Sequence, residues 1–324
     1  MGQSRFTMFK QNTPLSPLSN YKIGGQAEYF FEAKNHYEVI KAVEDWQKLK
    51  QVKRPTDLVK SIFVLGGGTN VLMSEGVIPG LVLKPSIKTL KVNGNKITVG
   101  AGVLMSELLD FAVKHGLAGL EWAGGLPGTV GGAIRGNAGC FGGETKDVVG
   151  EVKSIDLLAR PLKVKKRGNK ECRFGYRDSV FKQNGSEVIL EATFAMKPGD
   201  KKELRRLADS RIAYRKERHP IEYPNIGSIF KNVDLNKVPK SVRARVAHVV
   251  KSDPFPVVPT AYLISDTGIK GVSSGGAMIS PKHPNFIVNV LNATSGDVKS
   301  LIILAKLEVK KKFGVELEEE VLVL

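Results

Sequence analysis

The segment IFVLGGGTN, residues 62–70, joins an apolar run to a glycine-rich turn and best indicates how the chain folds. The run Ile62 to Leu65 predicts a short buried strand. The strand leads directly into three glycines, Thr69 and Asn70. Glycines allow backbone N–H groups to converge on a phosphate, and the Thr and Asn side chains add donors. Taken alone, such a segment can also be a tight turn.

A second glycine-rich segment, GGLPGTVGGAIRGNAGCFGG, spans residues 124–143. No single strand or helix accommodates so many glycines at low cost, so we expect a long loop. Such a loop can cradle a second part of a dinucleotide. Neither segment has the spacing of a Rossmann fingerprint or a Walker A loop. Two such segments in one chain make a pair of simple turns the weaker interpretation.

Apolar periodicity and capping residues predict strands and helices around these two segments. We expect further strands at residues 81–83, 97–99, 148–158, 162–166, 188–196, 277–279, 286–288 and 315–324. We expect helices with caps at Asn35, Ser106 and Asp200, the last ending near Arg215, and further helices at 261–267 and 298–313. The break at Lys197 to Asp200 indicates a domain boundary.

The composition predicts a folded protein of two or three domains, with 324 residues and 42% hydrophobic content. No apolar run is long enough to span a membrane, and residues 1–10 contain no apolar core of an export signal. The two cysteines, Cys140 and Cys172, have no CxxC spacing, which fits a reducing cytoplasm. We therefore expect a cytoplasmic protein without membrane insertion.

The net charge of +17 has two interpretations. One is nucleic-acid binding. The other is a basic surface, helped by an anionic substrate. The basic clusters at 201–218 and 306–312 lie in helical patterns that also carry acids, and aromatic residues are not interleaved with them. We favour the second interpretation and expect no specific nucleic-acid partner.

The segment YPNIGSIFKN, residues 223–232, gathers polar groups of several kinds. Ser228 follows Gly227, and Lys231 and Asn232 come shortly after it. A hydroxyl, a cation and an amide at this spacing can hold and protonate an anionic substrate. The same residues can also form an ordinary turn.

Eight motifs follow one another along almost the whole chain: LGGGTNVL (65–72), GLPGTVGGA (125–133), NAG (137–139), CRFGYRDSVF (172–181), NIGSIFKN (225–232), LIxxxGxKG (263–271), HxxFxxN (283–289) and FGVxLEEEV (313–321). Together they resemble the UDP-N-acetylenolpyruvoylglucosamine reductase family, which has the p-cresol methylhydroxylase/vanillyl-alcohol oxidase fold. The resemblance implies an α+β protein with two FAD-binding α+β subdomains, 1–86 and 87–199. A C-terminal α+β substrate-binding domain would follow at 200–314, with the strand 315–324 returning to the first subdomain.

The resemblance also implies a reaction. Hydride would pass from NADPH to noncovalent FAD and from flavin N5 to the enolpyruvyl ether of a UDP-sugar, and a proton would be added at the neighbouring carbon. Three residues match the family's catalytic positions. Arg177 would hold the substrate carboxylate, Ser228 would donate the proton, and Glu320 would support the enol intermediate.

Further positions match binding residues of the family. For FAD these are Gly66, Gly67, Gly68, Thr69, Asn70, Gly125, Gly128, Thr129, Gly131, Asn137 and Gly139. For the UDP-sugar they are Tyr176, Arg218, Lys231, Asn232 and His283. The remaining histidines have no metal-ligand spacing, so we expect no metal.

The chain departs from the family pattern at a few positions. The pattern Leu-Glu-Pro-Glu-Val is Leu317-Glu-Glu-Glu-Val321 here, so Glu320 is selected by anchoring on Leu317 and Val321. Val233 stands where proline usually follows, and Cys140 stands where a small residue such as Ala is common. No tyrosine-bearing insertion precedes the serine segment, which indicates the shorter type of the family.

Two alternatives differ from this interpretation. One is another FAD-dependent oxidoreductase of the same fold, and the other is a basic nucleic-acid-binding protein. We expect a monomer whose partner is a small UDP-sugar.

Overall fold

The computed structural model describes residues 8–252 and 255–324. The N-terminal stretch expected to lack an export signal therefore lies mostly outside the described residues. Two compact units are present. The first contains the described residues up to Thr13 together with 27–67 and 77–213. The second contains 14–26, 68–76 and 214–324.

In the first unit, a four-stranded sheet has the strand order β1-β2-β5-β3. Its strands are β1 (Lys10–Pro14), β2 (Gln26–Ala33), β3 (Ile62–Val64) and β5 (Val77–Pro85). The predicted strand before the glycines is thus β3, and it pairs in parallel with β5. The helix α1 (His36–Leu49) buries Val39, Val43 and Trp46, and the predicted cap is confirmed because the Asn35 side chain accepts from Glu38 N. A short helix, α2 (Pro55–Lys60), was not predicted.

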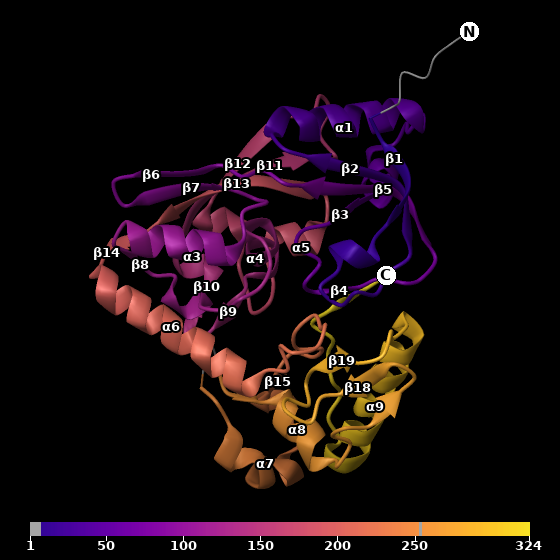
Figure 1. The fold of residues 1–324 in the computed structure, drawn as a ribbon, viewed down its shortest axis with the longest axis vertical. Helices are drawn as coiled ribbons and strands as arrows, with labels where there is room; N and C mark the ends of the chain where they lie inside the picture. Colours follow the sequence, from indigo (N-terminus) through magenta and orange to yellow (C-terminus); the bar gives the residue numbers. More distant parts are fainter. Residues whose placement is uncertain (1–7, 253–254) are drawn as a thin grey trace. The chain divides into compact units, whose positions relative to one another are not determined.

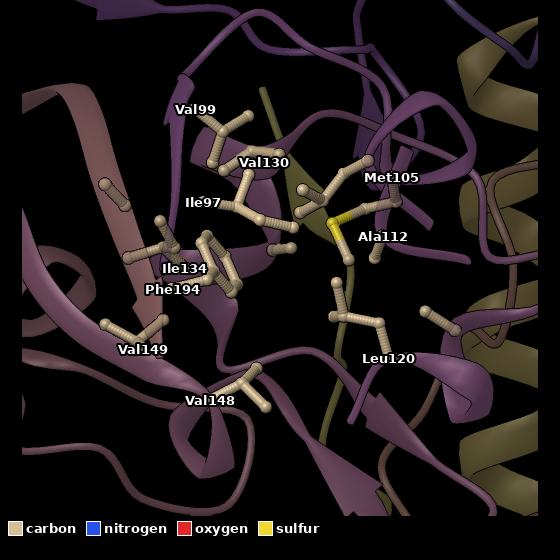
Figure 2. Close-up of a cluster of buried hydrophobic side chains, with 14 of the residues drawn as sticks. Ile97, Val99, Met105, Ala112, Leu120, Val130, Ile134, Val148, Val149 and Phe194 are labelled. Carbon is tan, nitrogen blue, oxygen red and sulfur yellow. The ribbon is translucent and has the colours of Figure 1, made fainter. Parts of the chain in front are cut away.

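The same unit contains a five-stranded antiparallel sheet of order β12-β11-β13-β7-β6. Its strands are β6 (Leu90–Asn93), β7 (Lys96–Gly100), β11 (Val149–Asp156), β12 (Val164–Gly168) and β13 (Glu187–Ala195). The helices beside it are α3 (Met105–Lys114), α4 (Val130–Gly136) and α5 (Val180–Asn184). Buried side chains from β7, β13 and these helices form one core, including Ile97, Ile134 and Phe194 (Figure 2). The strands predicted at 97–99, 148–158, 162–166 and 188–196 are therefore confirmed.

Two predictions in this region are wrong. Ser106 does not cap α3, because the cap position is Leu104 and the Glu107 carboxylate accepts from Leu104 N at 2.8 Å. The glycine-rich segment is also not a loop throughout, since α4 lies inside it. Glycine lowers helix propensity, but the helix packs closely on its neighbour here: a Cβ on Gly131 would lie 3.0 Å from the Cβ of Ala101. The remaining short strands of the unit are β8 (Leu117–Ala118), β9 (Gly139–Cys140), β10 (Gly143–Glu144) and β14 (Lys197–Pro198).

The second unit is built around the helix α9 (Ser295–Phe313), which begins with a Thr294/Asp297 capping box and ends at Gly314 in the left-handed conformation. Its buried face packs on the sheet β17-β18-β19, and Figure 1 shows the helix beside β18 and β19. Other elements of this unit include β4 (Val71–Leu72), β15 (Val233–Asp234), β16 (Val257–Val258), β17 (Ser273–Ser274), β18 (Ala277–Ile279), β19 (Ile287–Asn289), α7 (Lys240–Val246) and α8 (Thr260–Asp266).

The helix α6 (Lys201–Arg218) begins in the first unit, where Glu203 N donates to Asp200 Oδ1 as predicted, and it runs one turn past the predicted end. The long strand predicted at 315–324 is wrong. Only β20 (Leu322–Val323) forms there, parallel to β4, and the preceding residues make an isolated bridge at Glu319. No helix in the described ranges is long and apolar enough to cross a membrane.

Within the second unit, residues 14–26 bond to residues 287 and 289 and also approach residues 74–76 closely. Tyr21 Oη donates to Ile287 O at 2.7 Å, and Asn289 Nδ2 donates to Tyr21 O at 3.0 Å. Gly25 N donates to Ser74 O at 2.7 Å. A Cβ on Gly25 would lie 2.0 Å from Gly76 O, so only glycine fits there without a backbone shift.

We therefore predict that Gly25→Ala lowers the free energy of unfolding by about 1–3 kcal/mol, because the added methyl group overpacks a backbone contact. The matched control is Gly76→Ala, since a Cβ at Gly76 would meet no atom within 4 Å. Its effect should stay within about 0.5 kcal/mol. Urea unfolding of both variants measures the difference, and equal stability of the two would show that the close approach does not constrain the chain.

Candidate active site

The serine segment, residues 227–231, has its backbone fixed on both sides. Gly227 has a φ of +83°, and its N–H donates to Asn225 Oδ1 at 3.0 Å. This is an Asx turn, in which an Asn side chain bonds the backbone two residues on. Ser228 follows and is half-buried, whereas Ile229 and Phe230 are buried in the core of the unit. The turn thus presents the Ser228 hydroxyl from an anchored backbone.

The acidic tail, Glu318 to Glu320, runs antiparallel beside this segment. Phe230 lies opposite Glu319 in an isolated bridge. Glu320 N donates to Ile229 O at 2.8 Å, and Lys231 N donates to Glu318 O at 2.9 Å. These bonds fix the register of the tail and place the backbone of Glu320 next to the residue that follows Ser228.

The structure distinguishes the three glutamates of the tail. The Glu318 carboxylate forms an ion pair with Lys231, and the Glu319 carboxylate forms one with Lys306 at 2.5 Å. The backbone oxygen of Glu320 accepts from Asn70 Nδ2 at 3.1 Å. The segment 68–76 is therefore connected to the tail at Glu320 through a predicted cofactor-binding residue.

The two predicted substrate-binding residues after the serine also have partners within the unit. Lys231 O accepts from Thr260 Oγ1 at 2.5 Å, and Asn232 Oδ1 accepts from Thr260 N at 3.2 Å. Thr260 is the first residue of α8. Lys231 and Asn232 thus attach the serine segment to the start of that helix.

In the first unit, the two glycine-rich segments lie against each other. A Cβ on Gly67 would be 3.1 Å from the Cα of Gly128, and one on Gly66 would be 3.0 Å from Thr129 Oγ1. Any side chain at these glycines would fill the narrow space between the segments. Glycine backbone beside a threonine hydroxyl is a setting in which backbone N–H groups can bind an anion, so the residues are compatible with the phosphates of a dinucleotide.

Other predicted cofactor residues contribute backbone shape. Gly125 and Gly128 have φ values of +70° and +104°. A Cβ on Gly139 would lie 2.6 Å from Glu144 Cγ. In the second unit, Gly68 has a φ of +63°, and a Cβ there would lie 2.1 Å from Leu18 O. Thr69 also lies in the second unit.

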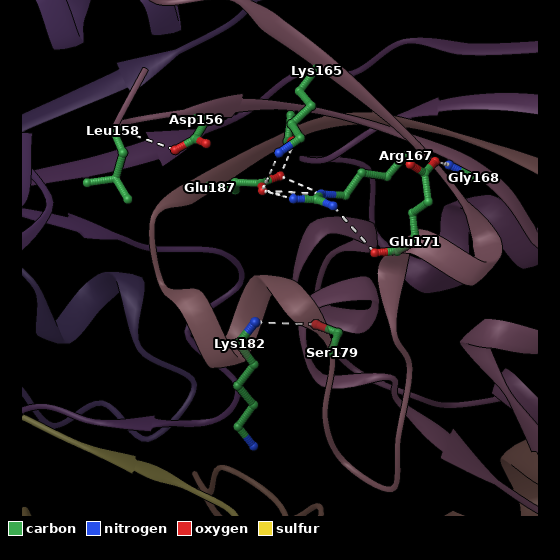
Figure 3. Close-up of polar contacts among 10 residues, drawn as sticks. Asp156, Leu158, Lys165, Arg167, Gly168, Glu171, Ser179, Lys182 and Glu187 are labelled. Atoms are coloured by element: carbon green, nitrogen blue, oxygen red, sulfur yellow. Dashed lines mark hydrogen bonds and ion pairs between the residues drawn. The ribbon is translucent and has the colours of Figure 1, made fainter. Parts of the chain in front are cut away.

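The turn that contains Arg177 is held by the second glycine-rich segment. Arg177 has a φ of +54°, and its Nη2 donates to Gly139 O at 2.9 Å. The Arg177 guanidinium lies 5.3 Å from the ring centre of Tyr176, and Lys182 Nζ donates to Arg177 O at 2.8 Å. Just after this turn, Ser179 caps α5 by accepting from Lys182 N (Figure 3).

Asn137, predicted to bind the cofactor, supports this turn from within the protein. Its side chain is fully buried, and its backbone adopts the left-handed conformation at the end of α4. Its Nδ2 donates to Gly175 O at 2.9 Å, and its Oδ1 accepts from Lys146 N at 3.0 Å. The amide therefore joins the glycine-rich segment to the arginine turn.

Arg218 and His283, the other two predicted substrate-binding residues of this unit, lie beside aromatic rings. Arg218 is exposed at the end of α6, and its guanidinium lies 5.0 Å from the ring centre of Tyr214. The His283 ring lies 5.3 Å from the ring of His219 and 4.8 Å from that of Phe286. Within the described chain, His283 Nδ1 is buried and makes no hydrogen bond.

Each unit thus brings together its own set of predicted residues. The first unit groups Gly66, Gly67, Gly128 and Thr129 in one place, and Asn137, Gly139, Tyr176 and Arg177 in another. The second unit groups Ser228, Lys231, Asn232, Glu320 and Asn70. Among the residues that the structure describes, no group of three or more His, Cys, Asp or Glu is placed to hold a metal ion.

Sequence reasoning missed three residues that hold the serine segment: Asn225, Thr260 and Asn285. The spacing Asn225-x-Gly227 is a recognised turn signal and could have identified Asn225. Thr260 and Asn285 contact the segment only through the tertiary fold. No local pattern marks either of them.

Comparisons with known proteins cover nearly the whole chain. The family model "UDP-N-acetylenolpyruvoylglucosamine reductase, C-terminal domain" matches residues 219–324, and "FAD binding domain" matches residues 27–160. The UDP-N-acetylenolpyruvoylglucosamine reductase of Lactobacillus acidophilus is 36% identical over 96% of this chain and 93% of its own length. That of Caldanaerobacter subterraneus is 37% identical over 96% of this chain and 91% of its own.

A solved structure supports the same relationship. The crystal structure of UDP-N-acetylenolpyruvylglucosamine reductase from Thermus caldophilus matches with a TM-score of 0.72 and 27% identity. The match covers 96% of this chain and 97% of the other. The predicted α+β fold class with its FAD-binding part is thereby confirmed.

The paired histidines predict an acid-sensitive stability. Burial lowers the pKa of both His219 and His283 to about 4, whereas an unfolded histidine has a pKa of about 6.5. Between pH 4 and about pH 6.5 the unfolded chain binds more protons than the folded chain. The stability that comes from burying the two neutral histidines is therefore present above about pH 6.5 and is lost as the pH falls toward 4.

We therefore predict that replacing both histidines with phenylalanine reduces the loss of unfolding free energy between pH 7 and about pH 4.5. Urea unfolding of both proteins at each pH measures that loss. Because each protein is compared with itself at pH 7, a general destabilisation by the substitutions cancels. An unchanged loss in the double variant would contradict the prediction.

Proposed function

Because the chain belongs to the UDP-N-acetylenolpyruvoylglucosamine reductase family, we propose that it reduces the enolpyruvyl ether of UDP-N-acetylglucosamine enolpyruvate to UDP-N-acetylmuramate. The observation that carries this proposal is the match over 96% of the chain to reductases of that name. The enzyme is an FAD-dependent oxidoreductase of peptidoglycan synthesis, and NADPH is its reductant.

FAD, when bound, supplies the substrate with a hydride taken from NADPH. The residues that would hold it are those of the two glycine-rich segments, Gly66–Asn70 and 125–139. This assignment is supported by the close approach of Gly67 to the backbone of Gly128, with the Thr129 hydroxyl beside Gly66. Neither histidine nor cysteine occurs in Gly66–Asn70, which fits noncovalent binding.

The protein's own chemistry begins once hydride has reached the vinyl carbon. The neighbouring carbon then carries enolate character beside the substrate carboxylate, and it must receive a proton. We assign the donation of this proton to the Ser228 hydroxyl. A serine hydroxyl is a weak acid, so it can serve only when its position is fixed and the acceptor is strongly basic. The anchored backbone of residues 227–231 meets the first requirement.

Two further residues act on the charge that develops. Arg177 would hold the substrate carboxylate with two parallel hydrogen bonds, which is the geometry a guanidinium offers. Glu320 would hydrogen-bond the enol oxygen. The role of Glu320 is supported by its position opposite the serine segment, where Glu320 N donates to the oxygen of Ile229, the residue after the proposed proton donor. Stabilising charge where it develops is commonly the largest contribution to catalysis.

The UDP-sugar would be bound by Tyr176, Arg218, Lys231, Asn232 and His283. A cation such as Lys231 near the serine suits an anionic substrate, and its side chain is 18% exposed beside Glu318.

We also propose that the chain divides into the domains 1–86, 87–199 and 200–314, with residues 315–324 returning to the first domain. The protein would act as a monomer in the cytoplasm, which size-exclusion chromatography and cell fractionation can test.

We predict that Ser228→Ala separates the two half-reactions. Reduction of bound FAD by NADPH should keep its rate, because the hydroxyl has no part in it. Reduction of the UDP-sugar should slow by about 10²–10⁴-fold, the usual contribution of a positioned proton donor. Stopped-flow absorbance of the flavin measures each half-reaction separately.

The matched control is Ser300→Ala, an exposed serine on α9 of the same unit, which should leave both half-reactions unchanged. Substrate turnover at the wild-type rate in Ser228→Ala would remove this serine from the mechanism. Loss of both half-reactions together would mean that the serine acts on the fold or on FAD binding instead.

A further inference from the structure

Asn285, in the loop between β18 and β19, bonds directly to the backbone of the serine segment. The residue is 3% exposed. The Asn285 Oδ1 accepts from Phe230 N at 3.0 Å, and its Nδ2 donates to Phe230 O at 2.8 Å. Its backbone oxygen accepts from Ile229 N at 2.8 Å. One residue thus bonds the two positions that follow Ser228 at three points.

The Asn285 side-chain amide pairs with the Phe230 backbone as a neighbouring strand of a sheet would. A primary amide offers one donor and one acceptor side by side, and the N–H and C=O of Phe230 are the complementary pair. Phe230 is 2% exposed, so water cannot replace either bond. An unpaired buried donor or acceptor is costly, because it has given up its bonds to water without a replacement. Loss of either bond therefore favours a shift of the serine segment.

The opposite edge of the segment is held by the acidic tail, through Glu320 N to Ile229 O and Lys231 N to Glu318 O. Asn285 and the acidic tail therefore hydrogen-bond to the serine segment from two sides. We propose that Asn285 is a positioning residue for proton transfer, which sets the place of the Ser228 hydroxyl by fixing the backbone of Phe230. This inference rests on the proposed role of Ser228.

The test uses Asn285→Asp, which keeps the shape of the side chain. The carboxylate can still accept from Phe230 N, but it faces Phe230 O without a proton to donate. We expect kcat for UDP-sugar reduction by the holoenzyme to fall about 100-fold near pH 8, since a small misplacement near the reacting atoms can cost that much. Reduction of bound FAD by NADPH should be unaffected.

Lowering the pH should restore the kcat of Asn285→Asp, because the introduced carboxyl group, once protonated, can donate to Phe230 O as the amide does. We expect the ratio of variant to wild-type kcat to rise at least about tenfold between pH 8 and pH 5.5, since burial favours the neutral acid. His283, two residues away, stays neutral across this range because burial lowers its pKa to about 4. The nearby Lys231–Glu318 ion pair is common to both proteins.

The control for general destabilisation is Asn289→Asp. Asn289 is also buried and also bridges backbone groups, donating to Tyr21 O and accepting from Ala293 N at 2.8 Å. Its side chain bonds these two groups and not the serine segment. Asn289→Asp should lose stability yet keep its kcat at a temperature where it is folded, with no recovery in acid. Asn285→Ala should lose kcat at every pH, because alanine has no proton to regain.

The outcomes separate this inference from the proposed function. If Ser228→Ala abolishes substrate reduction while Asn285→Asp and Asn285→Ala both keep wild-type kcat, Asn285 does not position the serine. If Asn289→Asp loses as much kcat as Asn285→Asp, the effect is one of stability and the inference is overturned. If Ser228→Ala keeps full activity, the proposed proton donor itself is wrong, whatever the Asn285 variants do.

Discussion

The structure of the second unit depends on one constraint: the buried backbone after Ser228 must have all of its hydrogen bonds. Ile229 bonds to Asn285 O and Glu320 N, and Phe230 bonds to both ends of the Asn285 amide. Lys231 bonds to Glu318 O and to the Thr260 hydroxyl. The groups of Ile229 and Phe230, which are buried, would each cost about 1–3 kcal/mol if left unpaired. The segment is therefore held in one register.

This constraint links distant parts of the chain. The acidic tail is followed by β20, whose pairing with β4 brings in residues 68–76, and Asn70 bonds the Glu320 backbone. The tail therefore contacts the serine segment on one side and residues 68–76 on the other. A serine that donates a proton, as we propose for Ser228, needs a rigid support, and the hydrogen bonds available for it join residues 55 and 250 positions apart in sequence.

Much of the fold could be predicted from the sequence because its signals are local. The Asn35 cap, the β3 strand before the glycines and the stripe of α9 each follow from neighbouring residues. The α4 helix could not, because its glycines lower helix propensity and the close approach of Gly131 to Ala101 is a tertiary contact. The candidate catalytic residues came from motif resemblance, whereas Asn285 and Thr260 act on the site only through tertiary contacts that no spacing reveals.

The proposed role of Glu320 depends most on the register of the tail, in which Glu320 N bonds to Ile229 O. Its most direct measurement is kcat for UDP-sugar reduction by Glu318→Gln, Glu319→Gln and Glu320→Gln. The carboxylates of Glu318 and Glu319 are already paired with Lys231 and Lys306, and a glutamine oxygen can still accept a hydrogen bond from each lysine, so these two variants should lose much less kcat than Glu320→Gln. Glu320→Gln should lose about 10²-fold or more. Near-normal kcat in Glu320→Gln, with a large loss in either neighbour, would contradict the register and the account built on it.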